Sequence, residues 1–301
     1  MRYSRPVRIL LGILILALFA AYTYLRVHDC VMSDDVPQKK PKTTQTMKVE
    51  DAEKAAAAAA EATPEPEPTP EPTPELSPLM QTAKANADAL GLPMPPEIDI
   101  DDWQYVLVNG DHPLDPITYE PANLVYLNMT GDDTEIRTGY DENRQVVDEM
   151  IAQPLIDMTQ ACKAEGLLVY LSSGYRSYAV QQENFNRVCA NNGITDGKNG
   201  EGNYITMPAG HSEHQTGLCV DITDRYYEIK NDSIAQVDTV QWLGAHCADY
   251  GFILRFPQDK RDITHVMGES WHFRYVGVDA ARYMTDNNLC LEEFLALYGV
   301  E

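Results

Sequence analysis

Proline occupies every second position from Pro64 to Pro74, and this run constrains the fold more than any other feature of the chain. A proline lacks a backbone donor and fits neither a helix interior nor a central strand. The expected conformation is an extended polyproline II spacer, which rises about 3.1 Å per residue. Almost no apolar side chain lies in the run, so it cannot contribute to a core.

An uncharged apolar run of 17 residues precedes this spacer, at positions 9–25. Its length is at the short end of what spans a bilayer. Arg2, Arg5 and Arg8 lie before it, and positive charge on that flank keeps the N-terminus in the cytoplasm. We therefore expect an uncleaved signal anchor. A cleaved signal peptide is the alternative, but it would have a shorter apolar core and a small-residue cleavage site.

These features predict four segments. We expect a cytoplasmic N-terminus at 1–8, a transmembrane signal anchor at 9–25, an extracytoplasmic Ala- and Pro/Glu-rich stalk at 26–98, disordered along its length, and one folded domain at 99–301. The domain would lie on the outer side of the cell membrane and contact it only through the N-terminal helix. It carries 13 basic and 33 acidic side chains, which excludes nucleic acid as a partner because phosphate backbones repel such a surface.

Helical and strand patterns mix within the domain without regular alternation. Strands are expected at 105–108, 167–171, 218–222, 252–255 and 271–276. Helices are expected at 144–165, 178–190, 238–250, 278–286 and 291–298. This mixture predicts an α+β fold, a central antiparallel sheet flanked by helices.

Two short segments hold the residue types that bind a catalytic zinc ion, which needs three protein ligands and one open position for water. His214 and Asp221 lie seven residues apart, and His272 would be the third ligand. An odd offset on an unbroken strand puts two side chains on opposite faces, so a bend near Gly217 must bring His214 round. Glu269 precedes His272 by three residues. It would take a proton from the zinc-bound water, whose pKa is lowered to about 7, and pass it to the leaving amine.

Each of these pieces also has an ordinary structural explanation. A single histidine is more often a core or surface residue than a ligand, and an aspartate at a strand end is usually a turn former. Glu-x-x-His occurs by chance, and here it lacks the second histidine of the helical zinc motif. The combination still favours a metal site, because the chain has only seven histidines and several of them fall within or beside these two segments.

Three motifs of the chain recur together in one group of peptidases. They read Ser173-Gly174-Tyr175-Arg176-Ser177, then Ser212-x-His214-x-x-Gly217-x-Cys219-x-Asp221, then Glu269-x-Trp271-His272. Together they resemble the VanY-type D-alanyl-D-alanine carboxypeptidases, in the zinc peptidase superfamily that also includes D-Ala-D-Ala dipeptidases and L,D-carboxypeptidases of peptidoglycan. The resemblance covers residues from about 103 to 298 and implies the hedgehog-like fold of these enzymes.

The resemblance implies one Zn²⁺ per domain, with His214, Asp221 and His272 as ligands and Glu269 as general base and acid. It also implies that Arg176 stabilises the oxyanion of the tetrahedral intermediate or holds substrate, a role that suits the charge developing on the scissile carbonyl. A structural ion pair is the alternative for Arg176.

Four further residues are expected to bind substrate on the same resemblance. They are Ser212, Gln181, Tyr175 and Trp271. A polar group among them, or an arginine, would meet the terminal carboxylate that makes a substrate suitable for an exopeptidase. Plain core packing is the alternative for Trp271.

Two cysteines depart from the family pattern. Cys219 and Cys247 both stand where alanine is usual, and thiols outside the cell tend to pair, so we expect a Cys219–Cys247 disulfide. The alternative to a disulfide is that both cysteines are small buried hydrophobic residues. Zinc ligation by Cys219 is a further alternative, which we rank below the disulfide. The pairing of Cys162, Cys189 and Cys290 stays open.

The function expected on this resemblance is a membrane-anchored, zinc-dependent carboxypeptidase that removes the C-terminal D-alanine from peptidoglycan stem peptides. The same chemistry with another cut, as an L,D-carboxypeptidase or a cross-link endopeptidase, is the first alternative. A non-catalytic cell-wall-binding module on the same fold is the second, and the full set of ligands and base argues against it.

Overall fold

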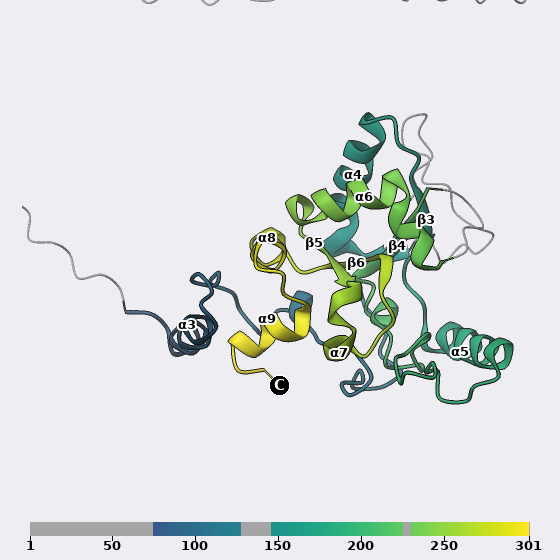
Figure 1. Cartoon of the computed structure of the whole chain (residues 1–301), viewed down its shortest axis with the longest axis horizontal. Helices are drawn as coiled ribbons and strands as arrows, with labels where there is room; N and C mark the ends of the chain where they lie inside the picture. The colour runs from purple at the N-terminus through teal and green to yellow at the C-terminus, as the bar shows by residue number, and fades with distance from the viewer. Residues whose placement is uncertain (1–74, 128–145, 225–229, 301) are drawn as a thin grey trace, which may run out of the picture. The chain divides into compact units, whose positions relative to one another are not determined.

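A four-stranded antiparallel sheet, ordered β3-β4-β6-β5, lies at the centre of the described part of the chain (Figure 1). The computed structural model describes residues 75–127, 146–224 and 230–300. These residues belong to the second of two units into which the chain divides, Thr73–Glu301. The anchor expected at 9–25 and the proline run lie outside the described residues. Within the described part of the chain, no helix is both long and apolar enough to cross a bilayer.

The elements follow one another without regular alternation of helix and strand, as expected for an α+β fold. The strands are β1 (Leu124–Tyr126), β2 (Val146–Asp148), β3 (Tyr170–Ser173), β4 (Cys219–Thr223), β5 (Phe252–Phe256) and β6 (Glu269–Tyr275). The α-helices are α3 (Pro78–Leu90), α4 (Glu149–Ala164), α5 (Tyr178–Asn192), α6 (Asp238–His246), α7 (Arg261–Thr264), α8 (Val278–Asp286) and α9 (Leu291–Leu297). The prediction of an α+β fold with an antiparallel sheet is confirmed.

The register of β4 against β6 separates two kinds of side chain. Asp221 pairs with His272 and Val220 with Phe273. Directly opposed residues of an antiparallel pair lie on the same face, and the face alternates with each residue. Asp221 and His272 therefore share one face of the sheet, and Val220 and Phe273 share the other.

Two helices cover the apolar face. Helices α4 and α6 lie together on one side of the sheet in Figure 1, and α5 lies apart from them. The fully buried side chains of this layer include Ile151, Leu155, Met158, Val220, Ile222, Leu243 and Phe273. The first residues of the helix expected at 144–165 form β2 instead, because Val146 and Val147 pair with β1. Helix α4 then begins behind Asp148, whose carboxylate accepts from the Met150 amide at 2.9 Å.

The predicted Cys219–Cys247 disulfide is wrong in this structure, where both thiols are free. The reason is the alternation along β4. Cys219 pairs with Arg274, on the face of Asp221. Cys247 packs in the apolar cluster of Val220, on the opposite face of the sheet.

The predicted domain boundary at residue 99 is also wrong, because part of the expected stalk is folded. Helix α3 begins at the Ser77 cap, and its buried residues Met80, Ala83 and Ala87 pack in the cluster that contains α8 and α9. The Asn86 amide donates to the Leu297 carbonyl at 2.9 Å, which fixes α3 to α9. The apolar spacing and the cap are both visible in the sequence.

Residues 105–108, expected as a strand, begin at the last residue of a 3₁₀ turn, Trp103–Tyr105, and pair with no strand among the described residues. Their backbone has a different partner. The guanidinium of Arg274 donates to the carbonyls of Gln104 and Val106, at 3.1 and 2.9 Å. A buried arginine therefore binds this segment where the sequence suggested a neighbouring strand.

Candidate active site

The bend expected between His214 and Asp221 is present. His214 lies in a 3₁₀ turn, Glu213–Thr216, and Gly217 follows with φ 74° before β4 begins. A Cβ at Gly217 would lie 2.9 Å from the Asp148 amide nitrogen, so the position requires glycine for space as well as for its conformation. The turn directs the His214 imidazole toward Asp221 on β4.

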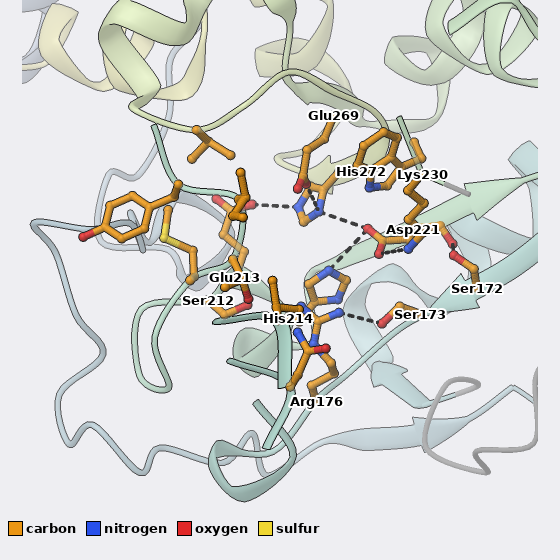
Figure 2. A pocket seen from close by; sticks show the side chains of 18 of the residues that line it. Ser172, Ser173, Arg176, Ser212, Glu213, His214, Asp221, Lys230, Glu269 and His272 are labelled. Carbon is orange, nitrogen blue, oxygen red and sulfur yellow. Dashed lines mark hydrogen bonds and ion pairs between the residues drawn. The ribbon is translucent and has the colours of Figure 1, made fainter. Parts of the chain in front are cut away.

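The three predicted metal ligands converge on one point (Figure 2). Asp221 Oδ1 lies 3.3 Å from His214 Nε2 and 3.1 Å from His272 Nδ1. Donors about 2.0–2.1 Å from a tetrahedral zinc ion lie about 3.3–3.4 Å apart, so these two nitrogen–oxygen distances fit zinc. All three residues are buried, each at most 4% exposed.

Each imidazole is held so that one ring nitrogen is turned toward this point. His214 Nδ1 lies 2.7 Å from the Gly174 carbonyl oxygen, which only accepts, so in the neutral ring the proton is on Nδ1 and Nε2 has the lone pair that a metal requires. His272 Nε2 lies 3.3 Å from Glu213 Oε2, which leaves Nδ1 for a metal. Such outer partners are the usual support of metal-binding histidines.

The surroundings of the two imidazoles stabilise positive charge. Burial lowers the pKa of His214 and His272, but nearby Cys219 and Asp221 outweigh it and raise both above the ordinary value. Burial likewise opposes ionisation of Cys219, yet the two imidazoles bring the pKa of its thiol down to about 7. Both effects suit a site that holds a cation between these groups.

Glu269 lies beside the ligands at the end of β6. Its Oε2 is 3.5 Å from His272 Nδ1, and its side chain is 22% exposed. Burial raises the pKa of this carboxyl above its ordinary value, although His272 opposes the effect. A carboxyl with a raised pKa is suited to accept and return a proton near neutral pH. The position matches the predicted role of general base and acid.

Arg176 is held by two neighbours on the wall of the same cavity. Its Nε donates to Gln181 Oε1 at 2.8 Å, and its Nη1 donates to Ser173 Oγ at 2.9 Å. Gln181 is 1% exposed and also donates to the Met207 carbonyl at 2.6 Å. The structure therefore places Gln181 behind Arg176 as its support, whereas the sequence predicted a substrate-binding residue.

A cavity of about 700 Å³ opens over the ligands. Ser212, Tyr175 and Trp271 line it, as their predicted role requires. Burial raises the pKa of the Tyr175 hydroxyl to about 12, so this group is a neutral donor at physiological pH. Trp271 also packs in a small apolar cluster with Ile234 and Val240, so its alternative role in core packing is observed, while substrate binding stays a prediction.

Glu213 is a site residue that the sequence interpretation missed. Its Oε1 accepts from Arg255 Nε at 2.7 Å and from Arg274 Nη1 at 2.8 Å, while Oε2 faces His272. Burial opposes its ionisation, but the two guanidinium groups hold the pKa of Glu213 well below the usual range. Arg255 continues the network to both oxygens of Glu292 on α9, at 2.8 and 2.7 Å. One sequence feature could have indicated a buried acidic partner such as Glu213. Two arginines, Arg255 in β5 and Arg274 in β6, lie within otherwise apolar strands.

Lys230 is a second residue missed from the sequence. Its ammonium contacts Asp221 Oδ2, and its side chain lines the cavity (Figure 2). It lies in none of the three motifs, so only the fold brings it to the site. The cavity wall therefore carries cations from three separate segments, Arg176, Arg187 and Lys230.

Comparisons with known proteins agree with this geometry. A family model described as VanY, D-alanyl-D-alanine carboxypeptidase, matches residues 144–278. The putative carboxypeptidase YodJ of Bacillus subtilis is 35% identical over 192 residues, which are 62% of this chain and 65% of that protein. A D-alanyl-D-alanine carboxypeptidase of Enterococcus faecalis is 34% identical over 203 residues, 65% of this chain and 67% of its own length.

A solved structure is similar in fold as well. The LdcB LD-carboxypeptidase has 32% sequence identity and a TM-score of 0.56, and the match covers 67% of this chain and 92% of that one. The chain thus spans just under two thirds of the Bacillus relative and most of the solved LdcB chain. The matched family segment includes the three predicted ligands, Glu269 and Arg176.

Proposed function

The chain belongs to the VanY family of D-alanyl-D-alanine carboxypeptidases, whose cofactor is zinc, and we propose that it hydrolyses the C-terminal D-alanine from peptidoglycan stem peptides. The observation that carries the proposal is the convergence of His214, Asp221 and His272 on one point, with Glu269 beside it. No ligand of the family pattern and no base is missing from this arrangement. A wall-binding module would not require the base.

The chemistry divides between the metal and the chain. Zinc, when bound by His214, Asp221 and His272, supplies a water of lowered pKa and polarises the scissile carbonyl. Glu269 accepts a proton from the attacking water and returns it to the nitrogen of the departing D-alanine. One water is consumed, the C–N bond breaks, and the products are D-alanine and a peptide shortened by one residue.

Arg176 has the role of stabilising negative charge on the carbonyl oxygen during attack. A guanidinium held by Ser173 and Gln181 needs little reorganisation when that charge develops, which is the condition for effective electrostatic catalysis. Lys230 and Arg187 place further positive charge on the cavity wall, where the terminal carboxylate of an exopeptidase substrate requires it.

An L,D-carboxypeptidase is the second candidate, and the match to the LdcB LD-carboxypeptidase favours it. Both activities use the same ligands and the same base. They differ in the configuration, D or L, of the residue before the scissile bond. Side chains that line the cavity must discriminate between these two configurations.

The test is release of D-alanine by the purified full-length protein from defined stem pentapeptides and tetrapeptides. We expect D-alanine from the pentapeptide, abolished by a chelator and restored by Zn²⁺. Release from the tetrapeptide alone would replace the proposed activity by the L,D-activity. No release from either substrate by zinc-loaded protein would contradict both. Metal content measured on the same samples separates failure of chemistry from failure of metal binding.

We propose, as the sequence predicts, that residues 9–25 anchor the protein in the cell membrane with the hydrolase domain outside. The acidic domain and the proline spacer after residue 63 support this arrangement. Protease treatment of intact cells should digest the domain and leave the N-terminal segment in the membrane fraction. Protection of the domain from protease would contradict the proposed orientation.

A further inference from the structure

Cys219 lies against the metal site on the side away from the base. It is fully buried, and it shares the face of β4 with Asp221, two residues on. Along β6 the order is Glu269, then His272 opposite Asp221, then Arg274 opposite Cys219. The ligand pair therefore lies between Glu269 at one end and Cys219 at the other.

The thiol is within reach of both imidazoles. The Sγ of Cys219 and one ring nitrogen each of His214 and His272 all lie within 4.8 Å of one another. The two rings are perpendicular, with centroids 4.9 Å apart, so they present nitrogens to a shared centre from different directions. A soft donor thus completes a compact cluster with the same two histidines that approach Asp221.

We propose that Cys219 is a fourth protein ligand of the zinc ion, bound as the thiolate. This proposal rests on the zinc site of the proposed function, and it extends the donor set from two nitrogens and one oxygen to include one sulfur. With a water molecule on the cavity side, where Glu269 lies, the zinc ion would have five ligands instead of four. Alanine, which the family pattern has here, offers no donor.

The chemistry of the ligands supports the assignment. Thiolate is among the strongest protein donors for zinc, with bonds of about 2.3 Å. On binding, the S–H bond of Cys219 breaks, a metal–sulfur bond forms, and one proton is released to solvent. A fourth ligand adds affinity, and electron donation by sulfur makes the metal a weaker Lewis acid.

The test is the absorption spectrum of the metal-free full-length protein titrated with Co²⁺, which takes the place of zinc. A thiolate bound to Co²⁺ gives an intense charge-transfer band in the near ultraviolet, whereas nitrogen and oxygen ligands do not. We expect this band in the wild type and its loss in Cys219→Ala and Cys219→Ser. Cys247→Ala is the matched control, because it removes an equally buried thiol from the opposite face of the sheet, and it should keep the band.

A second measurement reports the same ligand without cobalt. In competition with a chelator, Cys219→Ala should lose zinc at least about tenfold more readily than the wild type, the lower end of what loss of an outer partner costs. Identical cobalt spectra for wild type and Cys219→Ala would overturn the proposal, as would a band that also disappears in Cys247→Ala. Circular dichroism confirms that each variant is folded.

Failure of this inference is distinguishable from failure of the proposed function. Hydrolysis of stem peptides without a sulfur band would retain the carboxypeptidase and remove Cys219 from the ligand set. A sulfur band without hydrolysis would retain the four-ligand metal site and contradict the proposed activity.

Discussion

The two faces of the central sheet are equally buried and chemically opposite. On one face Val220, Ile222 and Phe273 are fully buried among apolar helices. On the other, Asp221 and His272 are at most 4% exposed, yet both are polar. Burial alone therefore does not distinguish the core from the site. The apolar face is stabilised by removal of surface from water, whereas every group on the polar face must find a specific partner.

The polar face meets this requirement by charge pairing. Glu213 and Glu292 neutralise Arg255 and Arg274 in one buried network of direct hydrogen bonds. That network ends at His272, so the charge pairing also holds a predicted metal ligand in place. The comparison predicts that changes on the polar face alter chemistry or metal binding, and that changes on the apolar face alter stability alone.

The largest expected effect is at Glu269. Glu269→Gln keeps the shape of the side chain and removes its basicity, so the turnover number should fall about 10²–10⁴-fold, the usual contribution of acid–base catalysis. Zinc content and the free energy of unfolding should stay near wild-type values, because Glu269 is partly exposed at the cavity. Steady-state kinetics with a stem pentapeptide is the measurement. Turnover within tenfold of wild type would remove Glu269 as the base.

Phe273→Ala tests the prediction that a change on the apolar face alters stability alone. Phe273 is fully buried between β4 and β5 neighbours, and its truncation should cost about 3–5 kcal/mol of unfolding free energy. Denaturant titration of the zinc-free protein measures this loss. Zinc affinity of the folded fraction should change little, since the side chain points away from the ligands. A large loss of affinity at unchanged stability would contradict the separation of the two faces.

Glu213→Gln lies between these cases, because Glu213 belongs to the polar face but touches only one ligand. The neutral amide weakens the support of His272 Nε2, so zinc affinity should fall about 10–100-fold. Chelator competition measures the affinity. Glu292→Gln is the matched control, since it disturbs the same Arg255 without contacting His272. If both variants lost zinc equally, the effect would be general destabilisation and not support of the ligand.

Sequence reasoning could select the candidate ligands and the candidate base because their chemistry is carried by residue type and spacing. His214, Asp221, His272 and Glu269 stand in short motifs. The register of β4 with β6 places Asp221 opposite His272, and the bend predicted near Gly217 brings His214 to them. The strands at 252–255 and 271–276 were predicted for a similar local reason, since their composition is strongly β-forming.

What the sequence did not predict depends on contacts between distant segments. Glu213 becomes a site residue only because strands β5 and β6 place Arg255 and Arg274 beside it. The disulfide failed for a related reason. Cys219 and Cys247 were paired because both replace alanine in the family pattern, whereas the alternation of β4 places them on opposite faces of the sheet. Helix α3 is a different kind of miss. The Ser77 cap can be recognised in the sequence, but residues 26–98 were assigned as a whole to a disordered stalk, so no helix was predicted there.

The smallest expected effect concerns pH and the outer end of the charge network. Arg255 overcomes the effect of burial and lowers the pKa of Glu292 below its ordinary value. A carboxyl whose pKa falls on folding adds stability above its unfolded pKa of about 4.3, and this stability is lost as pH falls through the folded value. Glu292→Gln should therefore be about 1–3 kcal/mol less stable than wild type at pH 7. The difference should shrink toward zero below about pH 4.3, because protonated Glu292 resembles the amide. Denaturant titrations of both zinc-free proteins across this range measure it. A difference that is independent of pH would mean that Glu292 acts through packing and not through its charge.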